Sequence, residues 1–269
     1  MIRARSAEVS VEVAGTPEEA WDAIATGPGI TAWFVPAEVE EREGGAVSLD
    51  VGTGMGPAGT VTGWDPPRRF AYEEAWPALD GEPAGRLATE FHVEARGGGT
   101  CVVRIVSSVV ASSEAWDTEL DNLNEGWRSY LRNLALYMSR HRGQRCATIL
   151  VTGLAPGSPA DGWAALTRAR GLVEAGEGRR TGATAADTPA LAGAVERESA
   201  GPHHRDLLVR LDRPAVGSAF VYVYGHGDQV HVNVHAYLFG EDAEAVAARD
   251  RPRWEAWMRE RFGVPAAAG

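Results

Sequence analysis

The sequence predicts an α+β protein in which a curved antiparallel sheet wraps around one long C-terminal helix, with this plan present in two tandem copies. The first 140 residues contain a capped helix, a series of alternating segments and a long amphipathic helix, in that order. The second half repeats the order in shortened form, which indicates a duplication. A sheet and a helix in this arrangement commonly enclose a pocket for a small apolar molecule.

The bulk composition is typical of a folded protein and disfavours two kinds of partner. Of the 269 residues, 44% are hydrophobic and 23% are charged. A formal net charge of -11 disfavours binding to nucleic acid or to a membrane surface, because both require a basic face. No stretch approaches the roughly 18 consecutive apolar residues of a spanning helix, and the N-terminus lacks the apolar core of a signal peptide, so we expect a cytoplasmic protein. Cys101 and Cys146 are expected to be free thiols.

The N-terminal segment predicts a strand followed by two short helices. Residues 7–13 alternate between valine and polar side chains, as a half-buried strand does. Thr16 is expected to cap the first helix, because a proline follows it and Glu19 lies three residues further on, as in a capping box. Residues 26–29 break this helix, and a second short helix is expected at residues 30–34.

Six further strands and a long helix complete the first half of the chain. The strands are separated by turns rich in glycine and proline, and they are expected at about residues 38–41, 46–51, 59–65, 69–75, 85–95 and 100–110. From about residue 113 to residue 141 the apolar period becomes helical. One face of this helix carries Leu120, Leu123, Trp127, Leu131, Leu134 and Met138. That apolar stripe is expected to lie on the sheet.

The second half predicts fewer elements. These are a strand at residues 147–152, a helix from Pro159 to residue 170, strands at 207–211, 219–224 and 229–239, and a terminal helix at 242–262 with Trp254 and Trp257. Residues 174–190 have the weakest pattern and form either a loop or a degraded pair of strands. We place one domain at residues 1–142 and a second, shortened domain at residues 146–263.

Several motifs of the first half resemble a known superfamily. They are Thr16-Pro-Glu-Glu-Ala-Trp21, Gly29-Ile-Thr-Ala-Trp33-Phe34, Gly44-Gly45 before a strand, Gly59-Thr-Val-Thr-Gly-Trp-Asp-Pro-Pro67-Arg-Arg-Phe70, Gly98-Gly-Thr100, and Glu125-Gly-Trp127 followed by Leu131 and Leu134. In this order they resemble the START-like (SRPBCC) superfamily, which has the helix-grip fold of the birch-pollen allergen. The branch most similar is the C-terminal domain of the activator of heat-shock protein 90 ATPase. The resemblance covers residues 7–140, and the second half looks like a divergent copy.

The resemblance implies several functions, because the superfamily includes ligand carriers, polyketide aromatase/cyclases, stress-associated proteins and partners of a chaperone ATPase. Our first expectation is a protein that binds a small hydrophobic or aromatic molecule in the cavity between the sheet and the long helix of the first domain. The alternatives are a polyketide aromatase/cyclase-like enzyme and an interaction protein similar to the chaperone-ATPase activator. A homodimer is one expected assembly, and no cofactor is expected.

The residues expected to contact the ligand are Trp33, Phe34, Tyr72, Phe91, His92, Arg104, Trp127 and Leu131. The aromatic members could stack on a flat apolar ligand. A cyclase would need one polar side chain in the pocket to position a carbonyl or to move a proton, and Tyr72, His92 and Arg104 are the candidates. No catalytic residue is assigned, since no acidic pair has a suggestive spacing and Glu73-Glu74 is interpreted as a solvated edge.

Polar side chains alternate with valine in the last predicted strand. His231, Asn233, His235 and Tyr237 share one face of this strand. A metal site that also used His226 is conceivable, but the two histidines of the strand are separated by about 13 Å. They are too far apart to share one ion easily. We therefore expect no metal, and a face that is either solvated or in contact with another domain.

Overall fold

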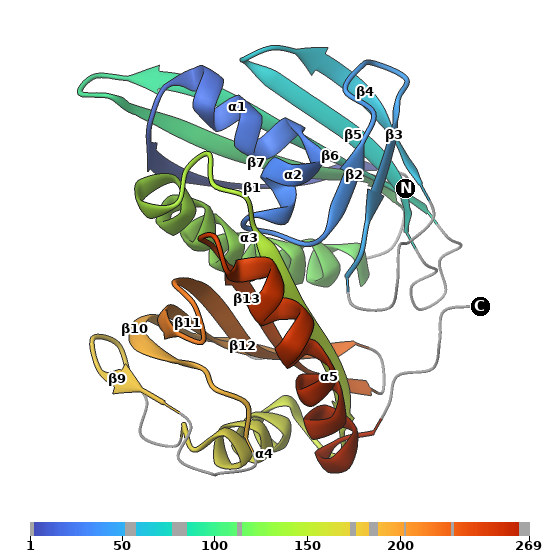
Figure 1. The fold of residues 1–269 in the computed structure, drawn as a ribbon. Coiled ribbons are helices and arrows are strands. Elements are labelled where there is room, and N and C mark those ends of the chain that lie inside the picture. Colours follow the sequence, from blue (N-terminus) through green and yellow to red (C-terminus); the bar gives the residue numbers. More distant parts are fainter. Residues whose placement is uncertain are drawn as a thin grey trace. The chain divides into compact units, whose positions relative to one another are not determined.

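The computed structural model describes residues 3–51, 58–76, 85–111, 115–172, 176–182, 188–201, 203–226 and 229–263. The chain divides into two compact units, of which the first ends at Gly143 and the second begins at Gln144. Figure 1 shows that each unit consists of an antiparallel sheet with helices packed against it.

The sheet of unit 1 contains seven strands, which are β1 (Arg3–Ala14), β2 (Ala37–Val39), β3 (Ala46–Leu49), β4 (Gly59–Asp65), β5 (Arg69–Trp76), β6 (Gly85–Arg96) and β7 (Thr100–Ala111). Their order in the sheet is β1-β7-β6-β5-β4-β3-β2, and neighbours are antiparallel. The first strand pairs with the last along its length, from Arg3 opposite Ala111 to Ala14 opposite Thr100. The sheet is thus completed by two segments that are far apart in the sequence.

Two short helices, α1 (Pro17–Ala25) and α2 (Gly27–Thr31), connect β1 to β2. The capping box at the start of α1 is formed as predicted, with the Glu19 amide donating to Thr16 Oγ1 at 3.3 Å and the Thr16 amide donating to Glu19 Oε2 at 2.8 Å. The second helix begins earlier than predicted, because Thr26 caps it and its hydroxyl accepts a hydrogen bond from the Gly29 amide at 3.0 Å. Trp33 and Phe34 consequently lie in the turn after α2, not in a helix.

The long helix α3 (Ala115–Arg140) packs against β1 and β7 and crosses the first sheet, as Figure 1 shows in green. The apolar stripe predicted for this helix is buried at Leu120, Trp127, Leu131, Leu134 and Met138, and Leu123 is partly buried. A hydrogen bond of 2.8 Å from Asn133 Nδ2 to the carbonyl of Trp33 ties α3 to the turn after α2.

Unit 2 repeats the plan. It contains β8 (Ala147–Ala155), α4 (Pro159–Arg170), β9 (Arg180–Thr181), β10 (Ala192–Ala200), β11 (His204–Arg213), β12 (Gly217–His226), β13 (Gln229–Leu238) and α5 (Ala243–Arg261). The order of its sheet is β8-β13-β12-β11-β10-β9, so the first strand again pairs with the last. A second capping box, formed by Ser158 and Asp161, starts the helix that follows the first strand. The prediction of an α+β helix-grip fold in two tandem copies is therefore confirmed.

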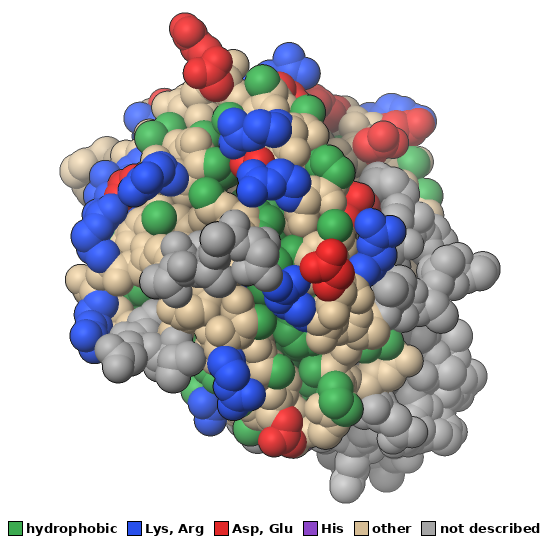
Figure 2. Space-filling model, turned by 60° about the horizontal axis from the view of Figure 1, so that its bottom comes forward, with side chains coloured by type: hydrophobic (Ala, Val, Ile, Leu, Met, Phe, Trp, Pro, Cys, Tyr) green, Lys and Arg blue, Asp and Glu red, His purple; other side chains and the backbone are tan. Residues whose placement is uncertain are grey.

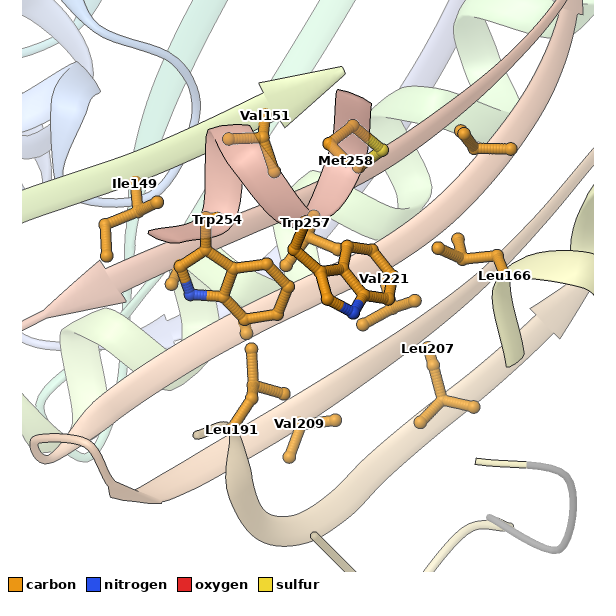
Figure 3. Packing of buried hydrophobic residues seen from close by; sticks show 14 of the residues in the cluster. Ile149, Val151, Leu166, Leu191, Leu207, Val209, Val221, Trp254, Trp257 and Met258 are labelled. Carbon is orange, nitrogen blue, oxygen red and sulfur yellow. The ribbon is translucent and has the colours of Figure 1, made fainter. Parts of the chain in front are cut away.

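The core of unit 2 lies between its sheet and the helices α4 and α5. Figure 3 shows Trp254 and Trp257 of α5 beside apolar side chains from the strands. Glycine permits the close approach of α5 to the sheet, because a Cβ atom at Gly153 would lie 2.8 Å from Met258 Sδ. The Val face of β13 belongs to this core, and it includes Val232 and Val234.

One strand of unit 2 was not predicted. Residues 173–175 and 183–187 lie outside the described residues, and within the rest of the weakly patterned segment the structure has only the short strand β9. The longer strand β10 follows that segment. A register shift between Val195 and Arg197 interrupts its pairing with β11, so its apolar side chains do not alternate strictly along the sequence.

The described surface mixes charges of both signs. On the face in Figure 2, basic side chains lie among acidic and hydrophobic ones. Exposed pairs such as Arg68 with Asp65 and Arg42 with Glu40 contribute little stability, because solvent screens them. Among the residues described, no helix combines the length and hydrophobicity that a membrane span needs.

Candidate functional site

A row of three hydroxyl groups crosses the inner face of the first sheet, on the side of α3. Tyr72 of β5 lies opposite Thr89 of β6, which in turn lies opposite Ser107 of β7. All three side chains are buried. The indole of Trp127 on α3 donates a hydrogen bond of 3.1 Å to Ser107 Oγ, so one end of this polar row contacts the helix.

Aromatic side chains lie on one side of the polar row. The ring centroids of Phe34 and Trp127 are 4.7 Å apart, and those of Phe91 and Trp127 are 5.9 Å apart. Trp33 lies 6.5 Å from Phe91, and Leu131 is buried one turn after Trp127 on α3. The structure thus brings together five of the predicted contact residues, and Tyr72 joins them through Phe70, which is 5.7 Å from Tyr72 and 6.0 Å from Phe91.

A separate apolar cluster lies on the other side of the polar row. It consists of Leu87, Val109, Trp116 and Leu120, with Ala7, Trp76 and Leu123 packed against it. Leu87 and Val109 are cross-strand partners, two residues away from Thr89 and Ser107 on their strands. The polar row therefore separates two apolar groups inside unit 1.

Glu74 follows Tyr72 on the same face of β5. Burial raises the pKa of its carboxyl group from 4.5 to about 7, and no cation among the described residues offsets this shift. The neighbouring Glu73 has the opposite orientation, and its carboxylate accepts a hydrogen bond from Arg86 Nε at 2.9 Å. The interpretation of Glu73-Glu74 as a solvated edge is thus correct for Glu73 and wrong for Glu74.

Tyr72 retains its proton in this environment. Burial raises the pKa of its hydroxyl group well above 10, the nearby carboxyl group of Glu74 raises it further, and contact with the Thr89 hydroxyl acts in the opposite direction. The site therefore combines a hydroxyl that can donate a hydrogen bond with a carboxyl group whose pKa lies close to neutral pH.

Two predicted contact residues lie on the opposite face of the sheet. His92 and Arg104 are cross-strand partners, and they alternate with buried side chains of the inner face. His92 Nε2 lies 3.4 Å from Glu90 Oε2, and Arg104 Nη1 lies 3.3 Å from Glu8 Oε2. Neither side chain faces α3, because the period of two along a strand gives both of them the outward orientation.

Glu74, Thr89 and Ser107 are not among the contact residues predicted from the sequence. A signal for them was present, because each lies two residues from an inward-facing aromatic or aliphatic side chain on its own strand. Short hydroxyl side chains and a glutamate near a strand end are also common on solvated faces, so their type alone did not mark them.

The polar face of β13 in unit 2 is buried. Tyr224 stacks on His231 at 4.7 Å between ring centroids, and the Tyr237 hydroxyl lies 2.9 Å from His235 Nδ1. Asn233 Oδ1 accepts a hydrogen bond of 2.8 Å from the Thr152 hydroxyl. Of the two expectations for this face, the solvated one is wrong. Burial lowers the pKa of His235 to about 3, so its imidazole is neutral.

Three solved structures that are similar to the chain share little sequence with it. CalU16 from Micromonospora echinospora is 22% identical, with 51% of this chain and 78% of that chain covered and a TM-score of 0.40. DynU16, described as a putative protein in the dynemicin biosynthetic locus, is 14% identical, with 94% and 95% covered and a TM-score of 0.43. BexL, a di-domain ARO/CYC from the BE-7585A biosynthetic pathway, is 12% identical, with 97% and 100% covered and a TM-score of 0.46.

No curated protein sequence matches the chain significantly. A family model does match residues 14–139, and its description is Activator of Hsp90 ATPase homolog 1-like protein. The matched segment extends from the last residue of β1 to the last turn of α3, so it covers the helix pair, strands β2 to β7 and the long helix. Residues 14–139 are thus similar to the Activator of Hsp90 ATPase homolog 1-like family.

Proposed function

We propose that unit 1 binds a small, mainly apolar or aromatic molecule between its sheet and α3. The observation that carries this proposal is the polar row of Tyr72, Thr89 and Ser107, which is buried between two apolar groups. A binding site for a small molecule typically has apolar walls with a few polar groups that fix the orientation of the ligand. The interior of unit 1 has this composition.

The polar groups limit the kind of ligand. Tyr72 offers a hydroxyl, Glu74 offers a carboxyl group, and the buried indole N–H of Trp76 has no acceptor among the described residues. A flat molecule with a carbonyl or hydroxyl group would satisfy these groups, and its apolar part would contact Phe91 or Trp127. A saturated hydrocarbon would leave the same groups without partners.

Thermal unfolding in the presence of a panel of aromatic ketones, phenols and matched hydrocarbons tests the proposal. We expect at least one oxygenated aromatic compound to raise the melting temperature of the full chain, with the corresponding hydrocarbon weaker. Glu74→Gln and Tyr72→Phe should reduce the shift. Glu73→Gln is the matched control, because Glu73 lies on the other face of the same strand and pairs with Arg86. If no compound in the panel stabilises the wild type, the proposal fails.

A second candidate is a cyclase-like enzyme that uses the same site. It is favoured by the position of Glu74, whose pKa is about 7, on the same strand face as the protonated Tyr72. A carboxyl group with such a pKa can accept and return a proton near neutral pH, and the tyrosine could hydrogen-bond to a carbonyl oxygen. His92 and Arg104 do not take part in this candidate, since they face outward.

Incubation with a soluble poly-β-ketone distinguishes the two candidates. An enzyme should form a cyclised product at a rate that rises with pH through about 7 as Glu74 ionises, and Glu74→Gln should abolish this dependence. A carrier should bind the compound and release it unchanged. Mass alone does not distinguish a cyclised isomer from the open chain. The formation of the ring is therefore followed by its ultraviolet absorption.

A further inference from the structure

Arg170 is a buried cation in the core of unit 2. It is the last residue of α4, and 1% of its surface is exposed. Its guanidinium carbon lies 4.6 Å from the ring centroid of Trp254 and 5.8 Å from that of Trp257. Both indoles come from α5, so the guanidinium lies between the two helices of the unit. Cation–π contact compensates part of the cost of removing this charge from water.

The hydrogen bonds of Arg170 are incomplete. Its Nη1 donates to the carbonyl of Pro189 at 3.0 Å. Its Nε and Nη2 are buried, and neither has an acceptor among the described residues. These two nitrogens form one edge of the guanidinium, where two N–H groups point the same way at the spacing of two carboxylate oxygens.

The same edge holds a carboxylate at two other arginines of this chain. Nε and Nη2 of Arg68 donate to the two carboxylate oxygens of Asp65 at 3.1 and 2.8 Å. Those of Arg249 donate to Asp250 at 2.9 and 2.6 Å. At Arg170 the edge is enclosed in the core, where an unpaired charge is far more costly than on the surface.

No acid in the described part of the chain compensates Arg170. Burial alone lowers the pKa of its guanidinium, to about 9, with no carboxylate contributing. Asp250 is also buried in unit 2, but it is paired with Arg249 and Arg253. The indole Nε1 of Trp257 is a further buried donor without an acceptor among the described residues. Among the described residues, this core therefore contains three buried donors without an acceptor, two of them on one edge of a cation.

We propose that Arg170 anchors a carboxylate-binding site in the core of unit 2, with Nε and Nη2 holding the two oxygens of a small carboxylate ligand. The indoles of Trp254 and Trp257 would contact the guanidinium from the sides and leave this edge for the ligand. The site is independent of the one proposed for unit 1. The ligand of unit 2 would be an anion, whereas the ligand proposed for unit 1 is mainly apolar.

The full chain, labelled with ¹⁵N-arginine, is titrated with formate, acetate and benzoate, which form a series of increasing size. The neutral amides formamide, acetamide and benzamide serve as matched controls. We expect at least one carboxylate to shift the Nε–H resonance of Arg170 saturably and to raise the melting temperature, while its amide does neither. Arg170→Met should weaken binding by at least about tenfold, since two charge-assisted hydrogen bonds are lost.

Arg261→Met is the control variant, because Arg261 also lies over the Trp257 ring, at 5.0 Å, yet belongs to the outer side of α5 and keeps 24% of its side chain exposed. It should bind the carboxylate as the wild type does. The proposal is overturned if no carboxylate moves the Arg170 resonance, if Arg170→Met retains the response, or if chloride or inorganic phosphate is as effective. Should Arg170→Met not fold, the titration of the wild-type resonance decides alone.

Discussion

Among the described residues of unit 1, Glu74 has a carboxyl group whose pKa is raised by burial from 4.5 to about 7. A group whose pKa is higher in the folded state binds more protons there than in the unfolded state. The stability associated with Glu74 is therefore fully present below pH 4.5 and is lost as the pH rises through about 7. At about 1.4 kcal/mol per pKa unit, the loss amounts to at most about 3.5 kcal/mol.

Glu74→Gln should remove this pH dependence, because glutamine does not ionise. Urea unfolding at pH 5 and pH 8 measures it, and the variant should be more stable than the wild type at pH 8 by up to a few kcal/mol. Glu73→Gln should follow the wild type. If the free energy of unfolding changed equally between pH 5 and pH 8 for Glu74→Gln and the wild type, Glu74 would be solvated.

His235 has the opposite dependence on pH. Burial lowers its pKa from 6.5 to about 3, so its stabilising effect is present above pH 6.5 and is lost as the pH falls toward 3. In unfolding experiments, we expect the free energy of unfolding of His235→Asn to fall less than that of the wild type as the pH is lowered from 7 to 4. The exposed His203 supplies the control, since His203→Asn should lose as much stability over this range as the wild type.

The inward or outward orientation of a side chain could be predicted from the sequence. The burial of an ionisable group, and with it the shift of its pKa, could not. Strand alternation gave Phe91 and Tyr72 the inward face, and the same rule would have given His92 and Arg104 the outward face. The burial of Glu74 depends on the clusters packed beside it, which join residues distant in sequence. No local pattern contains that information.

Among the secondary-structure elements, the junction of α1 and α2 has a strict steric requirement. A Cβ atom at Gly29 would lie 1.9 Å from the carbonyl oxygen of Asp22 and 2.9 Å from the Cα of Ala23. Both are backbone atoms, which cannot rotate away. Gly29→Ala should therefore destabilise unit 1 by on the order of 3 kcal/mol.

Gly126→Ala provides the control for this prediction. Gly126 lies within α3, and an added Cβ there would meet nothing within 4 Å. Alanine has the higher helix propensity, so this variant should be more stable than the wild type by up to about 1 kcal/mol. Denaturant midpoints of the two variants measure the difference, and a Gly29→Ala variant as stable as the wild type would contradict the steric argument.

Most elements could be predicted from the sequence because they carry a clear period and a cap. Thr16 and Ser158 both start helices through capping boxes, and the stripe of α3 is regular. The exceptions have local causes. The start of α2 depends on Thr26, which both ends the first helix and caps the second, and β10 contains a bulge that interrupts its alternation.

For the whole molecule, the two-unit organisation predicts independent folding. Residues 1–142 contain the complete sheet and the long helix of unit 1. We propose that this segment is a domain, and we expect it to unfold cooperatively when expressed alone, with dispersed amide resonances. A collapsed segment without a cooperative urea transition would contradict the proposed boundary.

The homodimer stays a prediction, which sedimentation equilibrium of the full chain tests.

The pairing of the first strand with the last in each sheet affects how the protein is made on the ribosome. The partner of β1, β7, begins 97 residues later, counted from Arg3 to Thr100, so β1 leaves the ribosome well before it can pair. During translation it is an unpaired, valine-rich edge that other nascent chains can contact. A shorter delay, of 82 residues from Ala147 to Gln229, recurs for β8 and β13. Slow translation is therefore a hazard for this chain before residue 100 and again before residue 229, and a chaperone that covers extended segments should raise its yield most at those stages.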